Sequence, residues 1–478
     1  MSEQPFARRV ASSVLYSGVA SVTARLLNAG ALFYVLKVIT EEQFGIAALA
    51  LAFFNSVKSL TELGLGAALV QESKIDRLQV DSLFWMTFGL SSIVYVLIYG
   101  AAPFVAEFYD TPMLSDMIRV YMIAIVVFAL YMIPSKLMMK DLEFKKLAIS
   151  DNVALALSAG LMIVLAYLGY GAWSIILAEL ANKVGQMLFC QIFKPYLPKF
   201  HFNYQKVKHL VSFGIYTTGS KFLQNFYMNA DYLIIGKFFS KELLGIYSFA
   251  YRLVFDTVKE LSNVVNRVAF PTFSKLQYEI PRLRTYFYTI SRASMLLVGT
   301  VMVVIGAYVD WFLPIVGYEK WMDAVPYMRI FVVVGIFQCL VTLLPKLINA
   351  KGQARFNFYY TIANAILLPV SFLIAAQYSM MAVALSWLVI YPMVSLVIIY
   401  FGAYLTETNP ISFGLNSVTA FLTLIPLAIF ALAVRFGVEY FLEDQTWLAV
   451  LISTVMVLSI TGIVIWKNEQ KVIQAIKK

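Results

Sequence analysis

The sequence is poor in charged residues and in cysteine. Only 13% of its 478 residues are Asp, Glu, Lys or Arg, whereas 61% are hydrophobic. An ordinary soluble domain carries about 25% charged residues, so a soluble fold of this composition would leave much apolar surface in water. The two cysteines, Cys190 and Cys339, lie in apolar runs and exclude a disulfide framework. The composition therefore predicts an all-α polytopic membrane protein.

Several other features are missing, and each absence excludes a function class. We expect no cleavable signal peptide before the first apolar stretch, and no loop between the predicted spans is long enough to fold as a soluble catalytic domain. His201 and His209 share one basic loop, so we expect them to be solvated and expect no metal site. The string GIYTTGSK (214–221) has the wrong order for a nucleotide-binding loop. We therefore expect neither an enzyme nor an ATPase.

Apolar windows predict about 14 transmembrane helices. The rough cores are 12–36, 44–69, 82–105, 117–135, 147–168, 172–193, 210–236, 243–265, 287–309, 324–345, 356–376, 381–402, 413–434 and 446–466. The first, seventh and eighth contain polar residues and are the weakest of these predictions.

Basic residues alternate between the two sides of the membrane. The net charge of +10 is explained by basic loops on one side, where Lys136 and Lys140 are placed, so it gives no reason to expect nucleic acid as a partner. The opposite side holds few basic residues, namely Lys37, Lys237, Lys241, Lys320 and Arg435. The excess of Lys and Arg in cytoplasmic loops then predicts that both termini are cytoplasmic.

The second half of the chain repeats the first. A shift of 200 residues places Lys37 on Lys237, Thr40 on Ser240, Glu42 on Glu242 and Gly45 on Gly245, and a shift of 210 or 211 places Arg119 on Arg329, Pro134 on Pro345 and Lys140 on Lys351. Six spans separate the copies, and because six is even the copies insert in parallel. The expected domains are an N-lobe (1–208), a C-lobe (209–403), and two further helices with a tail (404–478).

Polar stripes interrupt the first, second, seventh and eighth predicted helices, whereas the third, fifth, eleventh and fourteenth carry few polar residues or none. A charge at bilayer depth is costly, about 2.5–3.5 kcal/mol or more, so it faces a partner or a water-filled cavity. The substrate-binding candidates on these stripes are Ser21, Arg25, Asn28, Lys58, Lys221, Asn225, Asn229 and Arg252. The candidates for binding a coupling H⁺ or Na⁺ are Asp231, Glu179, Asp256 and Glu62.

Some of these charges have a structural alternative. Lys58 and Glu62, like Arg252 and Asp256, are four residues apart on a helix and can neutralise each other. Glu179 can pair with a lysine such as Lys183. Arg25 and Lys221 have no acidic residue one turn away, which favours an anionic ligand for both.

Long segments resemble Wzx-type polysaccharide exporters of the multidrug/oligosaccharidyl-lipid/polysaccharide (MOP) superfamily. They are FGIAALALAFFNSVKSLTELGLGAALVQ (44–71), LFWMTFG (83–89), MMKDLEFKKLAISD (138–151), NADYLIIGKFFSKELLGIYSFAYRL (229–253) and FPTFSKLQ (270–277). The resemblance is to the polysaccharide transport family, in its colanic-acid and teichuronic-acid branch.

This resemblance implies two six-helix lobes around a V-shaped cavity, plus two C-terminal helices. It implies a flippase that moves undecaprenyl-diphosphate-linked oligosaccharide from the inner to the outer leaflet of a bacterial cytoplasmic membrane, by alternating access. Cationic cavity residues would hold the diphosphate. The expected partners are the lipid-linked oligosaccharide, membrane lipids, and a polymerase and chain-length regulator of polysaccharide assembly, with no cofactor beyond a coupling H⁺ or Na⁺.

Three alternatives remain open. A MATE-like antiporter for cationic small molecules predicts an acidic cavity, whereas the deep unpaired residues here are basic. A membrane-embedded glycan polymerase or ligase generally needs a large external loop, which the chain lacks. A flippase for the peptidoglycan precursor is a close variant and is harder to exclude.

Overall fold

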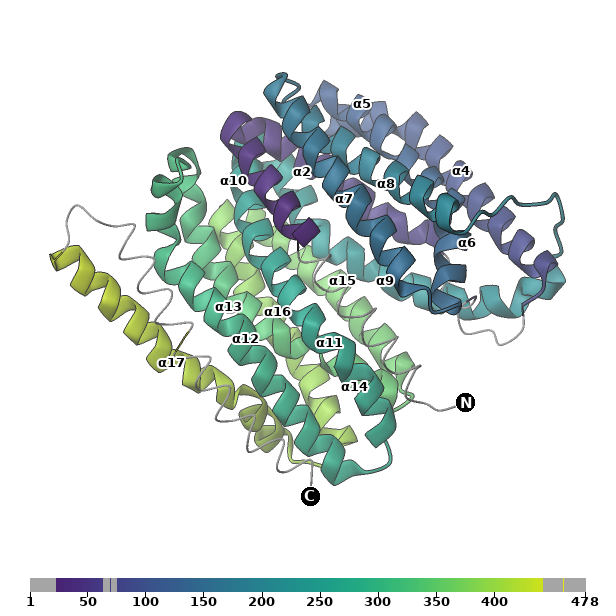
Figure 1. Ribbon diagram of the computed structural model, residues 1–478. Helices are drawn as coiled ribbons and strands as arrows, with labels where there is room; N and C mark the ends of the chain where they lie inside the picture. Colours follow the sequence, from purple (N-terminus) through teal and green to yellow (C-terminus); the bar gives the residue numbers. More distant parts are fainter. Residues whose placement is uncertain (1–22, 63–68, 70–74, 442–458, 460–478) are drawn as a thin grey trace. The chain divides into compact units, whose positions relative to one another are not determined.

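A computed structural model describes residues 23–62, 69, 75–441 and 459, and the regular structure within these ranges is helical (Figure 1). The elements are a helix over residues 23–38, α2 (Glu41–Glu62), α4 (Arg77–Phe108), α5 (Pro112–Tyr121), α6 (Ile123–Lys140), α7 (Phe144–Tyr167), α8 (Trp173–Phe193), α9 (Tyr204–Phe238), α10 (Lys241–Tyr251), η1 (Arg252–Asp256), α11 (Thr257–Leu276), α12 (Ile280–Ile315), η2 (Glu319–Ala324), α13 (Val325–Val341), α14 (Leu344–Ala350), α15 (Ala354–Ala376), α16 (Met380–Leu405) and α17 (Pro410–Phe441).

Nine helical segments within the described ranges are long and apolar enough to cross a membrane. They correspond to predicted spans two to six and nine to twelve, which confirms a polytopic helical membrane protein. α9 and the α10–η1–α11 run occupy the seventh and eighth positions, and their polar stripes lower the hydropathy. The predicted span 446–466 lies outside the described residues except for residue 459, so the count of 14 stays a prediction.

The internal repeat recurs in the local geometry of the helices. The amide of Gln43 donates to Thr40 Oγ1 at 3.2 Å at the start of α2, and the amide of Leu243 donates to Ser240 Oγ at 3.2 Å at the start of α10. Each hydroxyl satisfies an amide that the first helical turn leaves without a partner. The match of Thr40 with Ser240 is therefore a match of helix caps.

A second pair of repeat equivalents makes the same bond. Arg119 Nε donates to the carbonyl of Tyr99 at 3.3 Å, and Arg329 Nε donates to the carbonyl of Gly306 at 3.3 Å. Each arginine thereby ties its own helix, α5 or α13, to the helix that precedes it, α4 or α12. The pairing of Arg119 with Arg329 is thus visible in bonding as well as in sequence.

Gly45 and Gly245 lie at a backbone contact between α2 and α10. A Cβ added to Gly45 would lie 1.9 Å from the carbonyl oxygen of Lys241, and one added to Gly245 would lie 1.9 Å from that of Glu41. Since Glu41 and Lys241 are also repeat equivalents, each copy presents the same surface to the other. Only glycine permits this approach.

The chain separates into two compact units, Met1–Gly245 and Ile246–Lys478. α9 belongs to the second copy by sequence but lies in the first unit, where Gly236 of α9 packs against Leu49 of α2. The predicted boundaries at 208 and 403, which follow the repeat, stay predictions.

In the first unit, α6, α7 and α8 pack together and position the polar residues described below (Figure 1). Gly169 and Gly171 adopt positive φ values of 82° and 54° in the turn between α7 and α8, a region that favours glycine. The two helices then run close together, because an added Cβ on Gly185 would lie 3.0 Å from Ala154 Cβ. Gln191 Nε2 donates to the Leu130 carbonyl at 3.1 Å and fixes α8 to α6.

In the second unit, α17 lies along α12, outside the repeat (Figure 1). Arg435 of α17 donates to both carboxylate oxygens of Asp310 on α12 at 2.9 Å, and Arg329 binds the same carboxylate at 2.8 Å. Tyr308 Oη donates to the Ala431 carbonyl at 2.7 Å. These bonds attach the helix that follows the repeat to the helices of the second copy.

Candidate functional site

One face of α8 carries a polar stripe through the middle of the membrane. Glu179, Asn182, Lys183 and Gln186 recur at steps of three and four residues and therefore share a face. Lys183 lies ten residues from either end of the 21-residue helix, or about 15 Å from each end at 1.5 Å per residue. The hydrocarbon core is about 30 Å thick, so Lys183 is near its centre.

Asp151 of α7 lies within electrostatic range of three basic residues. They are Lys183 of α8, Lys136 of α6 and Arg25 of the 23–38 helix. Arg25 and Asp151 are exposed, whereas Lys136 and Lys183 are half-buried. We call these four residues the basic cluster.

The fifth predicted span was expected to carry few polar residues, and one of these few, Asp151, lies within electrostatic range of the cations. One sequence interpretation is wrong at this place. Lys136 was assigned to a cytoplasmic loop, but α6 continues through Pro134 to Lys140 and keeps Lys136 within the span. A proline within a helix bends it or removes one hydrogen bond and does not always end it.

Uncharged hydrogen-bonding groups flank the basic cluster. Gln186 Oε1 accepts from Tyr131 Oη at 2.9 Å and lies 3.4 Å from Lys183 Nζ. Lys183 is therefore oriented by Gln186, and the expected alternative pair of Glu179 with Lys183 is not among the ion pairs of the described residues. The side chain of Asn182 is buried, and its Oδ1 has no hydrogen-bond partner in this part of the chain.

The basic cluster combines three basic side chains with the carboxylate of Asp151. The three lie within electrostatic range of Asp151, and a charge at membrane depth is stable only beside a partner, water or a polar ligand. Arginine and lysine are the side chains that bind phosphate groups, arginine through two parallel bonds and lysine as a point charge. The arrangement can therefore hold an anionic phosphate-containing group, next to the hydrogen-bonded pair of Tyr131 and Gln186.

The polar residues predicted on the seventh helix lie on α9, where two of them form hydrogen bonds with the backbone of the same helix. Lys221 is exposed, while Asn225 and Asn229 are half-buried, and Asn229 Nδ2 donates to the Asn225 carbonyl at 2.7 Å. Asp231 is completely buried, and its Oδ1 accepts from the amide of Tyr232 at 2.9 Å. The proposed roles of these residues stay predictions.

The remaining candidates divide between helices of both units. Arg252 and Asp256 form the expected intrahelical ion pair at 3.7 Å, in the π-helical turn η1. Lys58 is half-buried on α2, and Asn28 is half-buried one turn from Arg25. The side chain of Glu62 and the whole of Ser21 lie outside the described residues.

The basic cluster is specific to the first copy of the repeat. α15 and α16 are the second-copy counterparts of α7 and α8, and Arg355 is their single Asp, Glu, Lys or Arg residue. Trp387 and Tyr391 of α16 are instead buried in an aromatic core. The repeat therefore supplies two similar scaffolds of which one carries the charged group.

Solved structures define the class of fold. The chain is similar to the lipid II flippase MurJ in an inward closed conformation, with a TM-score of 0.71 and 13% identity over 95% of this chain and 99% of that one. It is also similar to an inward-facing multidrug resistance MATE family transporter of the MOP superfamily, with a TM-score of 0.64 and 14% identity over 80% and 94% of the two chains. The fold is that of the MOP-superfamily transporters.

Sequence comparison then gives the family. Residues 35–326, more than half of the chain, match the model of the polysaccharide biosynthesis protein family, and the chain belongs to this family. Its relatives include the teichuronic acid biosynthesis protein TuaB of Bacillus subtilis (27% identical over 80% of this chain and 79% of that protein). The lipopolysaccharide biosynthesis protein WzxC of Escherichia coli is 24% identical over 77% of this chain and 75% of that protein.

Proposed function

We propose that the protein translocates an undecaprenyl-diphosphate-linked oligosaccharide repeat unit from the inner to the outer leaflet of the bacterial cytoplasmic membrane. The observation that carries the proposal is the basic cluster, three cations around Asp151 inside the membrane-spanning part of a polysaccharide biosynthesis protein. The names of TuaB and WzxC support a role in the supply of a surface polysaccharide.

In this proposal Arg25, Lys136 and Lys183 bind the diphosphate. Their positive charge offsets the loss of hydration that the diphosphate suffers on leaving the water at the membrane surface. Tyr131 and Gln186 bind sugar hydroxyls, and the lipid tail stays in the bilayer. A cationic drug would meet repulsion at the same place, which argues against a MATE-like antiporter of cations.

The protein then acts as a transporter and leaves the covalent bonds of its substrate unchanged. Transport is coupled to H⁺ or Na⁺ through a carboxylate, for which Asp231, Glu179, Asp256 and Glu62 remain the candidates. Both termini lie in the cytoplasm, and a polymerase and a chain-length regulator receive the translocated unit. A peptidoglycan precursor carries the same lipid diphosphate, so the choice between the two substrates rests on the sugars.

The test is surface polysaccharide in cells whose only copy of the protein carries Arg25→Ala, Lys183→Ala or Lys221→Ala, at matched protein levels. A hydrogen bond to a charged group contributes about 1.5–3 kcal/mol, so we expect export to fall about tenfold or more in the first two variants. Lys275→Ala is the control, because Lys275 is exposed at the end of α11. Unchanged export in the cluster variants would overturn the assignment of the site.

Reconstitution tests the activity itself. Purified protein in liposomes with a labelled undecaprenyl-diphosphate oligosaccharide is expected to make the label accessible to an external glycosidase. Accessibility equal to that of protein-free liposomes, with correctly folded protein, contradicts the proposed function.

A further inference from the structure

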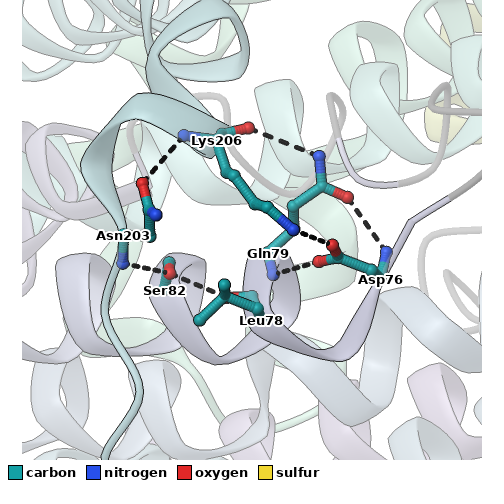
Figure 2. Close-up of polar contacts among 6 residues, drawn as sticks. All are labelled: Asp76, Leu78, Gln79, Ser82, Asn203 and Lys206. Carbon is teal, nitrogen blue, oxygen red and sulfur yellow. Dashed lines mark hydrogen bonds and ion pairs between the residues drawn. The ribbon is translucent and has the colours of Figure 1, made fainter.

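The segment that joins the two copies of the repeat, residues 194–203, is held against the start of α4. Lys206 Nζ lies 2.5 Å from Asp76 Oδ2, and the amide of Asn203 donates to Ser82 Oγ at 2.9 Å. Gln79 binds Asp76 and the carbonyl of Lys206, as Figure 2 shows. The joining segment therefore has a fixed position on the first unit.

A second set of bonds fixes the middle of the segment. Tyr196 Oη donates to the buried carboxylate of Asp81 at 2.6 Å, and burial and the Asp81 carboxylate raise the pKa of Tyr196. Arg77 of α4 donates to the carbonyl of Leu197. Trp85 Nε1 donates to the carbonyl of Lys199 at 2.9 Å. The polar groups of the segment thus point toward α4.

The large apolar side chains of the same segment stay exposed, although the ring of Phe200 stacks on Trp85 of α4 with the ring centroids 4.8 Å apart. Leu197 is 83% exposed, Phe200 is 90% exposed and Phe202 is 58% exposed. The segment lies between the end of α8 and the start of α9, so these residues are at the membrane boundary and not inside a span. Apolar and aromatic side chains in such positions are stable at the headgroup level of a bilayer.

The charge around these side chains has one sign. Residues 194–208 contain lysine and histidine but no carboxylate. Lys194 is paired with Asp141 at 2.6 Å and Lys206 with Asp76, whereas Lys199 and Lys208 have no carboxylate within ion-pair distance among the described residues. Two lysines therefore remain to attract an anion.

We propose that Leu197, Lys199, Phe200, Phe202 and Lys208 form an interfacial patch that binds anionic phospholipid. The three apolar side chains enter the headgroup region, and the two lysines bind the lipid phosphates. The patch lies on the more basic side of the membrane, where anionic lipids of the inner leaflet face it. This interaction does not depend on the identity of the transported substrate.

The test is native mass spectrometry of the full-length protein released from detergent with phosphatidylglycerol or phosphatidylcholine. Wild-type protein is expected to retain phosphatidylglycerol in preference to phosphatidylcholine. A lysine near an anionic surface contributes about fivefold to binding, so the variant Lys199→Gln/Lys208→Gln should bind phosphatidylglycerol at least about fivefold more weakly. Phe200→Ser/Phe202→Ser should weaken the binding of both lipids.

The matched control is Arg282→Gln/Arg355→Gln, which removes the same charge from two other exposed positions on the basic side. It is expected to bind phosphatidylglycerol as wild type does. All variants are compared at equal thermal stability. Equal affinity in wild type and the lysine variant, or an equal loss in the control, would overturn the proposal. So would a loss of polysaccharide export by the lysine variant with unchanged lipid binding, which would assign the patch to a protein partner.

Discussion

Asp151 is the residue on which the charge balance of the basic cluster depends. Its carboxylate lies within electrostatic range of Lys183, Lys136 and Arg25. An incoming anion must compete with it for the same cations. Asp151 therefore weakens binding and, by the same attraction, helps the cations release the anion.

We expect Asp151→Asn to bind diphosphate more tightly and to transport more slowly. The amide keeps the size of the side chain and removes the competing charge, so the affinity for inorganic pyrophosphate should rise about tenfold, as for loss of one close charge interaction. The measurement is the rise in the thermal unfolding midpoint with pyrophosphate concentration. Glu179→Gln is the comparison, since Glu179 is not among the partners of Asp151. Equal midpoint shifts in Asp151→Asn and wild type would contradict the competition.

At the scale of elements, the α2–α10 contact brings the backbones of the two copies very close together. A Cβ at Gly45 or Gly245 would lie 1.9 Å from a backbone oxygen, far below the 3.0 Å that real contacts respect. The obstructing atom is backbone and cannot rotate away. The two helices would have to separate.

Gly45→Ala and Gly245→Ala should each lower the thermal unfolding midpoint in detergent by several degrees, since overpacking typically costs about 1–3 kcal/mol. Gly89→Ala and Gly160→Ala are the controls, because both lie within helices with nothing within 4 Å of an added Cβ. The controls should be neutral, or more stable by up to about 1 kcal/mol through helix propensity. A midpoint in Gly45→Ala that matches the controls would show that the contact is not formed.

The attachment of the joining segment (194–203) to α4 depends on pH. The bond from Lys206 and the amide of Gln79 hold the pKa of Asp76 below its usual range. A carboxylate with a lowered pKa stabilises the fold above its ordinary pKa, and this contribution is lost as pH falls through the lowered value. Protection at the joining segment is therefore present at neutral pH and lost in acid.

Hydrogen exchange of residues 194–206, corrected for intrinsic rates, should show constant protection from neutral pH down to about pH 4, the ordinary carboxyl range. Protection should then fall below that range. Asp76→Asn should lack this protection already at neutral pH and show no such fall, while Asp116→Asn should behave as wild type. Wild-type protection in Asp76→Asn would contradict the role of the ion pair.

At the scale of the whole molecule, the distribution of basic loops predicts which side each loop faces. The native cysteines should not react with a maleimide, because Cys190 and Cys339 are both buried. In intact spheroplasts a membrane-impermeant maleimide should label Lys320→Cys and should label Arg355→Cys only after permeabilisation. The reverse pattern would invert the proposed topology.

Most of the helices could be predicted from the sequence, since an apolar window is a property of consecutive residues and the repeat is a match between two stretches of sequence. The sequence could not bring Arg25 and Asp151 together, because they lie on different helices and nothing in the spacing of either relates them. It also placed Lys136 in a loop, since the apolar window before it ended at residue 135. The spacing of Glu179, Asn182, Lys183 and Gln186 predicts a shared helix face. Only the charged residues Glu179 and Lys183 were proposed from the sequence.

The reciprocal contact of Gly45 with Lys241 and of Gly245 with Glu41 has the form of an isologous interface, in which two identical surfaces meet across a two-fold axis. Such an interface can form between two separate chains. It is what an ancestor with a single copy would have used to pair with itself as a homodimer. Fusion of the two genes would then have freed each half to change alone, so that α7 and α8 could hold charges that α15 and α16 do without.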